Sequence, residues 1–224
     1  MAKLRIATCQ FAISGNIRRN ATQIKRQIAQ AKKQRAQVVH LPEAALSGYA
    51  GVDVESWDGY DWDTLRREPE AICDLAAKSK VWVILGSAHP LSGRHKPHNC
   101  LYVINADGQI VDRYDKCFCT GADLKHYSPG DHLVTLDIHG VRCGLLICYD
   151  LRFPELYRAY KKQGVECLFD QVSVGGSDAA AQERCLGGFG EHQRVGVLSS
   201  HGSGRRANQP IEQSAQEHEQ HRNE

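Results

Sequence analysis

The chain has 224 residues, of which 42% are hydrophobic, and its 28 basic and 26 acidic side chains leave a net charge of +2. This length suffices for one substantial core, and so small a charge gives no reason to expect nucleic acid or an anionic membrane as a partner. Because no apolar run approaches the ~20 residues of a membrane span and the first residues lack the apolar stretch of a secretion signal, we expect a cytoplasmic protein.

Strand-like and helix-like patterns alternate up to residue 170. The strands are predicted at residues 4–9, 38–41, 81–86, 101–105, 109–114, 134–138, 141–147 and 166–169. The helices are predicted at residues 17–34, 69–79 and 155–163. The turns at Asp107-Gly108 and His139-Gly140 each join two strands as a hairpin. Strands that alternate with helices indicate a layered α/β fold.

Charged side chains follow two of the predicted strands. Pro42 cannot continue a central strand, so the strand before it ends near Leu41 and Glu43 lies in the loop at its C-terminal edge. Lys116 closes another strand-like run, which begins at Ile110. Each side chain taken alone has an ordinary interpretation, a solvated loop carboxylate for Glu43 and a surface ammonium for Lys116.

A thiol stands at the end of a third strand, where the apolar run before Cys148 turns polar and a helix-like stretch follows. This position aims backbone N–H groups and a helix N-terminus at whatever the sulfur attacks, as a nucleophile requires. The alternative is a buried free cysteine that ends a core strand. A carboxylate, an ammonium and a thiol at three strand ends favour catalysis, because open α/β sheets gather their chemistry there.

Four segments in this order resemble the nitrilase-like carbon–nitrogen hydrolases, a family with a Glu-Lys-Cys triad. The segments are Arg5-Ile-Ala-Thr-Cys-Gln10-Phe with Gly15-Asn16 and Asn20, His40-Leu-Pro-Glu43, Tyr-Asp-Lys116, and Gly144-Leu-Leu-Ile-Cys148-Tyr-Asp-Leu-Arg-Phe-Pro-Glu-Leu156. The resemblance covers about residues 1–169. It implies Glu43 as general base, Lys116 as the cation that holds the tetrahedral intermediate, and Cys148 as the nucleophile. A carboxylate that takes the thiol proton, beside an ammonium that favours the thiolate, activates such a nucleophile.

The resemblance also implies an α-β-β-α sandwich, a small amide-type substrate, a homo-oligomer and no cofactor. The family often places a second glutamate between the lysine and the cysteine, but residues 117–131 contain no Glu. Asp123 is therefore the nearest supporting candidate, and Tyr149, which follows the thiol, is another. The aromatic loop at residues 50–63 is a candidate lining of the substrate pocket, although it does not identify the substrate.

The nine cysteines form an odd number without regular spacing, which argues for reduced thiols and against a disulfide framework. Cys117 and Cys119, with the histidines between residues 89 and 98, invite a metal site. A Cys-X-Cys pair without a second paired set is weak evidence, and histidines in a Gly- and Pro-containing stretch are most simply loop residues. We therefore predict no metal.

The composition changes beyond residue 170. Residues 171–224 contain no Lys, Tyr, Trp or Thr, and such a segment cannot offset its ordering entropy by burying apolar surface. We expect a partial carbon–nitrogen hydrolase domain at 1–170, with the second half of the sandwich incomplete, and a disordered tail at 171–224 that is natural or frame-shifted. Two functions stay open: a thiol-dependent hydrolase of non-peptide carbon–nitrogen bonds, or a catalytically inactive truncated relative that pairs with full-length subunits.

Overall fold

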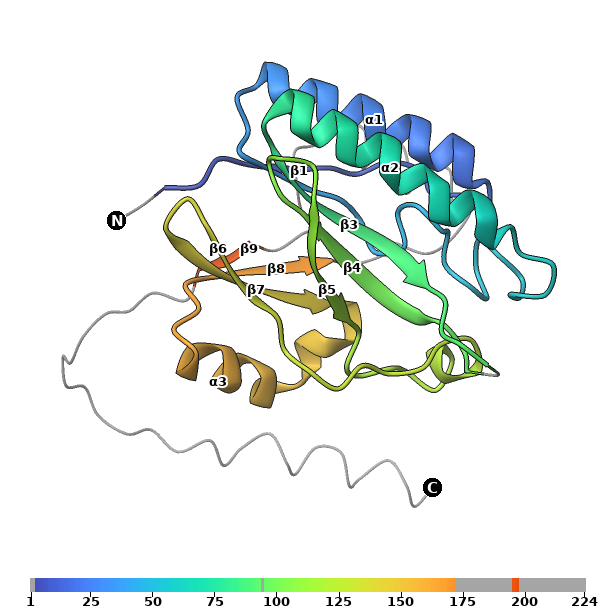
Figure 1. Ribbon diagram of the computed structural model, residues 1–224. Coiled ribbons are helices and arrows are strands. Elements are labelled where there is room, and N and C mark those ends of the chain that lie inside the picture. The colour runs from blue at the N-terminus through green and yellow to red at the C-terminus, as the bar shows by residue number, and fades with distance from the viewer. Residues whose placement is uncertain (1–2, 94, 172–194, 198–224) are drawn as a thin grey trace, which may run out of the picture.

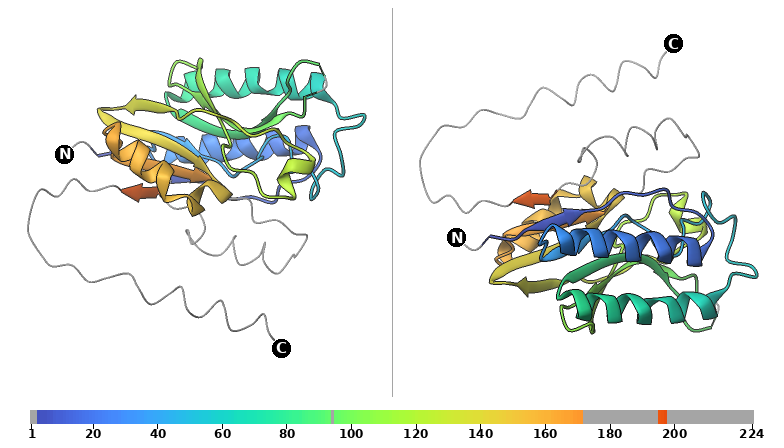
Figure 2. Two further views of the ribbon diagram at one scale, coloured as in Figure 1. Left: turned by 90° about the horizontal axis from the view of Figure 1, so that it is seen from below. Right: turned by 90° about the horizontal axis from the view of Figure 1, so that it is seen from above.

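The computed structural model describes residues 3–93, 95–171 and 195–197, and its two β-sheets lie between helices (Figure 1). The first sheet has the strand order β1-β2-β3-β4-β5 and the second has the order β6-β7-β8-β9. The helices α1 and α2 lie side by side against the first sheet, and α3 lies beyond the second sheet (Figures 1 and 2). The predicted α-β-β-α sandwich is therefore confirmed.

Most of the predicted elements are present within a few residues of their expected positions. The helices are α1 (Ile17–Lys33), α2 (Trp62–Ser79) and α3 (Pro154–Lys162), with short 3-10 turns η1 (Asp123–Lys125) and η2 (Cys148–Arg152). The strands of the first sheet are β1 (Ile6–Thr8), β2 (Val38–His40), β3 (Trp82–His89), β4 (His98–Ile104) and β5 (Ile110–Asp115). Those of the second sheet are β6 (Thr135–Ile138), β7 (Val141–Ile147), β8 (Cys167–Gln171) and β9 (Val195–Val197).

Strand direction decides which loops of the first sheet meet. The strands β1, β2 and β3 are parallel, whereas β4 runs antiparallel to both β3 and β5. Because two reversals restore the original direction, β5 runs the same way as β2 and ends at the same edge of the sheet. The segments that follow β2 and β5, which carry Glu43 and Lys116, are thus brought to one edge.

Three apolar layers hold the sandwich together. Helix α1 buries Ile24 and Ile28 against the first sheet, as their helical spacing predicts. Along β7, Leu145 faces the first sheet and Leu146 faces α3, because successive strand side chains point to opposite faces. Burying each such aliphatic side chain contributes about 1.5–3 kcal/mol, so these layers are the main stabilisation of the strands that end at the site.

Helix α2 begins at Trp62 rather than at residue 69, where we had placed its start. The Asp61 side chain caps the helix by accepting a hydrogen bond from the Thr64 N–H at 2.9 Å. Pro69 thus lies inside the helix, not at its first turn. A Pro inside a helix removes one backbone hydrogen bond, and here the buried stripe that includes Ile72 packs the helix despite that loss.

The predicted boundary at residue 170 falls within β8, which runs to Gln171 and pairs antiparallel with β9. Residues 172–194 and 198–224 lie outside the described residues, so the predicted disordered tail stays a prediction. No helix in the described part of the chain combines the length and the apolar character that crossing a bilayer requires.

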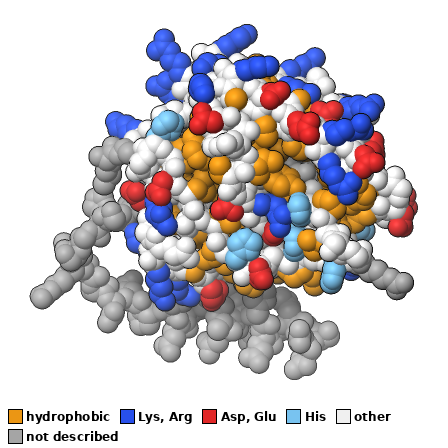
Figure 3. Space-filling view, viewed as in Figure 1, with side chains coloured by type: hydrophobic (Ala, Val, Ile, Leu, Met, Phe, Trp, Pro, Cys, Tyr) orange, Lys and Arg blue, Asp and Glu red, His pale blue; other side chains and the backbone are white. Residues whose placement is uncertain are grey.

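Hydrophobic side chains gather in the middle of the face seen in Figure 3, with basic side chains above them towards the two long helices. Strand β5 is an edge strand of the first sheet, and its Ile110 and Val111 are 48% and 47% exposed. An edge strand with exposed apolar side chains is a surface that another chain can cover. The predicted homo-oligomer nevertheless stays a prediction.

Candidate active site

Glu43 is held in a tight turn directly after β2. The Gly48 N–H donates to the Ala44 carbonyl at 2.9 Å, and the Leu46 N–H donates to the Gly86 carbonyl of β3 at 3.0 Å. The Glu43 side chain is 1% exposed, and its Oε1 accepts hydrogen bonds from Asn99 Nδ2 at 2.7 Å and from Lys116 Nζ at 3.0 Å. The carboxylate is therefore buried and oriented, unlike a solvated loop side chain.

The turn lies so close to β3 that only glycine fits at position 86. A Cβ atom there would clash with the Pro42 carbonyl oxygen and lie 2.8 Å from the Ala44 nitrogen. Both clashing atoms belong to the backbone of the turn that carries Glu43. A side chain at this position would therefore displace the carboxylate as well as strain the core.

We expect Gly86→Ala to lower the free energy of unfolding by about 1–3 kcal/mol, as overpacking typically does. Urea unfolding followed by circular dichroism measures the change. Gly121→Ala is the matched control, because a Cβ at that exposed glycine would meet no atom within 4 Å. Equal stability of the two variants would show that the turn adjusts freely.

Lys116 follows β5 and is 1% exposed. Its N–H donates to the Asn99 carbonyl at 2.9 Å, which continues the pairing with β4, and its Nζ lies 3.0 Å from both Glu43 Oε1 and Asp123 Oδ2. Burial alone would lower the pKa of this ammonium, but the two carboxylates outweigh burial and leave the pKa raised. The lysine is therefore a fixed cation.

Asp123 reaches the site from η1. Its Oδ2 accepts from the Thr120 N–H at 2.9 Å as well as from Lys116, and its Oδ1 accepts from the Tyr49 hydroxyl. Burial opposes the charge of Asp123, but the bonds from Tyr49 and Thr120, together with the Lys116 cation, lower its pKa. Asp123 thus brings an ionised carboxylate to the site, where the sequence had indicated it as a supporting candidate.

Cys148 begins the 3-10 turn η2 directly after β7, with a left-handed backbone at φ 48°. A non-glycine residue in this conformation costs about 1–3 kcal/mol, so the surroundings must hold it. Its N–H donates to Asp170 Oδ1 at 3.2 Å, and the preceding Ile147 N–H donates to Asp150 Oδ2 at 3.0 Å. The helix predicted at residues 155–163 is present as α3 from Pro154, and the 3-10 turn η2 lies between its N-terminus and the sulfur.

The thiol of Cys148 is half-buried and lies beside the Glu43 carboxylate. Burial and the negative charge of Glu43 raise the pKa of Cys148 to about 12, although Lys116 acts in the opposite direction. We had expected the ammonium to favour the thiolate, and its effect is present but outweighed. At rest the sulfur therefore carries its proton.

Asp150 ties the lysine segment to the cysteine segment. It is fully buried and accepts hydrogen bonds from the Tyr114 hydroxyl at 2.8 Å, the Phe118 N–H at 2.8 Å and the Ile147 N–H at 3.0 Å.

The second supporting candidate, Tyr149, lies on the same 3-10 turn as Asp150. Its ring is edge-on to that of Phe153, with 5.4 Å between the ring centroids. Sequence reasoning did not single out Asp150, because a polar side chain after a strand carries no sign of its partners.

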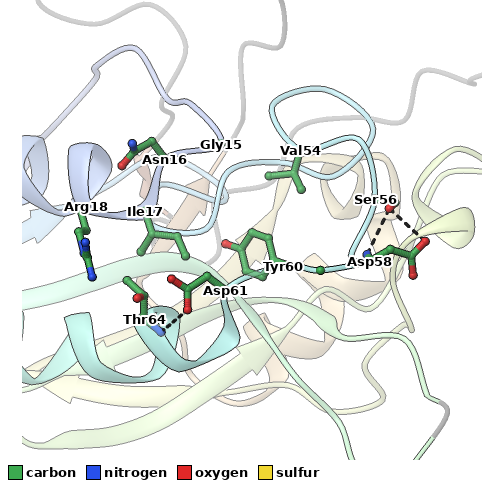
Figure 4. Close-up of a pocket in the computed structure, with 11 residues that line it drawn as sticks. Gly15, Asn16, Ile17, Arg18, Val54, Ser56, Asp58, Tyr60, Asp61 and Thr64 are labelled. Carbon is green, nitrogen blue, oxygen red and sulfur yellow. Dashed lines mark hydrogen bonds between the residues drawn. The ribbon is translucent and has the colours of Figure 1, made fainter.

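A separate hollow of about 430 Å³ lies at the start of α1 (Figure 4). It is lined by Gly15, Asn16, Ile17, Arg18, Val54, Ser56, Asp58, Gly59, Tyr60, Asp61 and Thr64. Part of the aromatic loop at 50–63 thus lines a hollow, but the lining contains none of Glu43, Lys116 and Cys148. We place the candidate active site at these three residues, because buried charged groups converge there.

The described residues contain no group of three or more His, Cys, Asp or Glu side chains arranged to hold a metal ion. Cys117 does not belong to such a group, and its Sγ lies 3.6 Å from each of the carbonyl oxygens of Asp115 and His132. His98 bonds the Ser128 carbonyl through Nδ1 at 2.8 Å, and His89 bonds the Tyr102 hydroxyl at 2.6 Å. These side chains have structural partners of their own.

Comparison with known proteins identifies the family of the chain. A family model described as carbon-nitrogen hydrolase matches residues 5–188. The chain therefore belongs to the carbon-nitrogen hydrolase family. The matched segment contains all the residues of the candidate site and runs past residue 170, beyond the point where the resemblance in the sequence was expected to end.

Two of the relatives of the chain are amidases. The chain is 31% identical over 186 residues to the deaminated glutathione amidase of Yersinia enterocolitica. The aligned segment covers 75% of this chain and 62% of that protein. The chain is also 30% identical over 177 residues to the human omega-amidase NIT2, and this alignment covers 75% of this chain and 63% of that protein. The chain thus spans less than two thirds of the length of these relatives.

A similar fold occurs in the amidase from Nesterenkonia sp. AN1. One structure of that enzyme is a variant in which the acetamide moiety of fluoroacetamide is covalently added at the active-site cysteine. It superposes with a TM-score of 0.69 at 22% identity, and the match covers 80% of this chain and 68% of that chain. This likeness shows that the fold is shared.

Proposed function

We propose that the chain is a thiol-dependent hydrolase that cleaves the carbon–nitrogen bond of a small amide-type substrate through a thioester on Cys148. One observation carries the proposal: the Lys116 ammonium is buried between two carboxylates, one of which also lies against the half-buried thiol. Amidases among the relatives support the amide as substrate class. The whole cluster lies in the described and family-matched part of the chain.

In the acylation step, Glu43 takes the proton of the Cys148 thiol as the sulfur attacks the carbonyl carbon. A carboxylate in contact with the thiol suits this role, because the sulfur is protonated at rest. The attack places a negative charge on the carbonyl oxygen. Lys116, which stays charged, and the backbone N–H of Tyr149 receive that charge, and each such donor is typically worth ~10²–10³ in rate.

The leaving nitrogen takes the proton from Glu43, and ammonia or an amine departs as the thioester forms. Glu43 then removes a proton from water, which attacks the thioester carbon, and the returned proton restores the Cys148 thiol as the acid product leaves. No cofactor is needed for these steps. In a variant of the Nesterenkonia amidase, the active-site cysteine is also the residue that forms a covalent bond, there with the acetamide moiety of fluoroacetamide.

Asp123 and Tyr49 serve the proposed chemistry indirectly, by holding Lys116. Asp123 has a side chain one methylene shorter than the second glutamate common in the family, and η1 brings its carboxylate within 3.0 Å of Lys116 Nζ. The Tyr49 hydroxyl occupies the other carboxylate oxygen, and the Tyr49 ring lies 5.9 Å from the ammonium. These contacts keep the lysine from turning away from the substrate carbonyl.

We expect Glu43→Gln to slow acylation and deacylation alike, each by ~10²–10⁴-fold, because one base serves both steps. Ammonia release from simple amides measures turnover, and intact-protein mass measures the acyl-enzyme. Glu155→Gln is the control, since that exposed carboxylate pairs only loosely with Arg158 at 3.6 Å. If only one step slows, a second base shares the work.

The inactive, subunit-pairing relative remains the alternative. It is the weaker interpretation, because a protein without catalysis has no need to bury an ammonium between two carboxylates beside a thiol. Absence of ammonia release from every amide tested, together with a folded protein by circular dichroism, would reverse the preference. Sedimentation of the same sample would test the predicted homo-oligomer.

A further inference from the structure

A buried carboxylate outside the proposed mechanism lies against the nucleophile. Asp170 is 2% exposed and lies near the end of β8, which runs parallel to β7. Its Oδ1 accepts the hydrogen bond from the Cys148 backbone N–H at 3.2 Å. No step of the proposed hydrolysis uses this side chain, although it is bonded to the residue that reacts.

Three elements place charged groups near the Cys148 side chain. Glu43 comes from the turn after β2, Lys116 from the end of β5 and Asp170 from β8. On the turn of the cysteine itself, Asp150 is occupied by Tyr114 and two backbone N–H groups. Two carboxylates and one ammonium thus act on the sulfur, which is an unfavourable setting for the further negative charge of a thiolate.

We propose that Asp170 is a positioning residue for Cys148: it holds the N–H of the left-handed nucleophile and places its carboxylate beside the thiol that Glu43 deprotonates. This inference deepens the proposed function and rests on it for its significance. The backbone hydrogen bond fixes the direction in which the sulfur leaves the strand, since Cys148 has φ 48°. The charge opposes formation of the thiolate, so the thiol depends on Glu43 for its activation.

The electrostatics of the site support this role. Burial contributes most to the raised pKa of Cys148, followed by Glu43, and Asp170 adds to the rise against the opposing effect of Lys116. A protonated thiol resists oxidation and alkylation, because the thiolate is the reactive form. An enzyme with this arrangement protects its nucleophile when no substrate is bound.

Asp170→Asn separates the two contributions of this side chain. The amide keeps an oxygen in place to accept the Cys148 N–H, but it removes the negative charge. A residue that only caps the backbone would leave the ionisation of the thiol unchanged in this variant. A residue that acts through its charge would shift the ionisation, so the pH profile of thiol reactivity distinguishes the roles.

The experiment follows alkylation of Cys148 by iodoacetamide from about pH 6 to 10, below the raised pKa of the thiol, where the rate follows the small thiolate fraction. Peptide mass spectrometry is the readout. We expect Asp170→Asn to raise the rate at every pH, by about tenfold for each unit by which the pKa falls. Asp137→Asn is the control, because that exposed carboxylate of β6 pairs with Arg142 at 3.0 Å. Its profile should match the unmodified protein.

An unchanged profile in a folded Asp170→Asn protein would overturn the inference. If circular dichroism shows that this variant is unfolded, Asp170→Ser is measured in the same way, and an unchanged profile there has the same meaning. Alkylation requires no turnover, so the test is independent of substrate. A shifted profile, together with no amide hydrolysis by the unmodified protein, would uphold the role of Asp170 and refute the proposed function. Hydrolysis by the unmodified protein, together with an unshifted profile, would uphold the proposed function and refute the role of Asp170.

Discussion

Cys148→Ala is expected to abolish hydrolysis, with a fall in turnover of about 10⁴-fold or more, as removal of a nucleophile typically causes. The reason is that the half-buried thiol beside Glu43 is the group we propose to form the covalent intermediate. Intact-protein mass after mixing with an amide substrate should show an acyl adduct on the unmodified protein and none on the variant. Ammonia release should disappear in parallel.

Another cysteine provides the control for this experiment. Cys73 lies on α2 and is also half-buried, but it packs against the core between the helices and the first sheet. Cys73→Ala should keep full turnover and the acyl adduct. Full turnover of Cys148→Ala would end the thiol mechanism, and loss of activity in both variants would point to a general loss of structure.

Lys116→Met should have a second large effect, on stability as well as on activity. Removing one partner of a buried ion pair typically costs about 3–5 kcal/mol, because the remaining charge is left uncompensated. Here the loss leaves two carboxylates, Glu43 and Asp123, buried beside each other. We expect the free energy of unfolding to fall by that amount at neutral pH, and turnover to fall with it because the oxyanion loses its cation.

The pH dependence of this effect has a definite sign. The pKa of Asp123 is lowered in the folded protein, so the ionised carboxylate stabilises the fold. This contribution to the free energy of unfolding is fully present above the unfolded pKa of about 4, and it is lost as the pH falls through the folded pKa. Without Lys116 the part of that stabilisation that comes from the ammonium is lost, while the hydrogen bonds from Tyr49 and Thr120 stay, and protonation of a carboxylate relieves the repulsion. The stability difference between the two proteins should therefore be largest at neutral pH and shrink as the solution is acidified.

Urea unfolding at several pH values measures this difference. Lys25→Met is the matched control, because Lys25 pairs with Glu68 at 3.3 Å on a partly exposed surface, where an ion pair contributes only about 0–1 kcal/mol. A stability difference for Lys116→Met that is as small as the control, or that does not change with pH, would contradict the buried charge network.

Some features of this protein were determined by local sequence alone. Pro42 had to end a strand, the apolar run before Cys148 had to form a buried one, and the spacing of Ile24 and Ile28 had to form one face of a helix. Each of these follows from backbone sterics or from hydrophobic periodicity, which act over a few neighbouring residues. They were sufficient to predict a layered α/β fold with polar groups at its strand ends, whereas the sandwich of two sheets was implied by the family resemblance.

The start of α2 shows where such local reasoning fails. Pro69 is typical of a first helical turn, so the sequence favoured a helix from that point. In the structure Asp61 caps the helix earlier, and the packing of Ile72 against the core compensates for the hydrogen bond that proline removes. Tertiary contacts thus outweighed the local cost of a proline inside a helix, which is typically about 3 kcal/mol or more.

The partners of the candidate catalytic residues were decided only by the tertiary structure. Asn99 binds Glu43, Tyr49 binds Asp123, and Asp170 binds Cys148, across chain separations that no local pattern encodes. The ionisation of the thiol is likewise a property of the assembled site, since burial and charges from three elements set it together. Sequence determines which chemical groups are present, whereas hydrogen bonds and charge interactions depend on distances that exist only once the two sheets have packed.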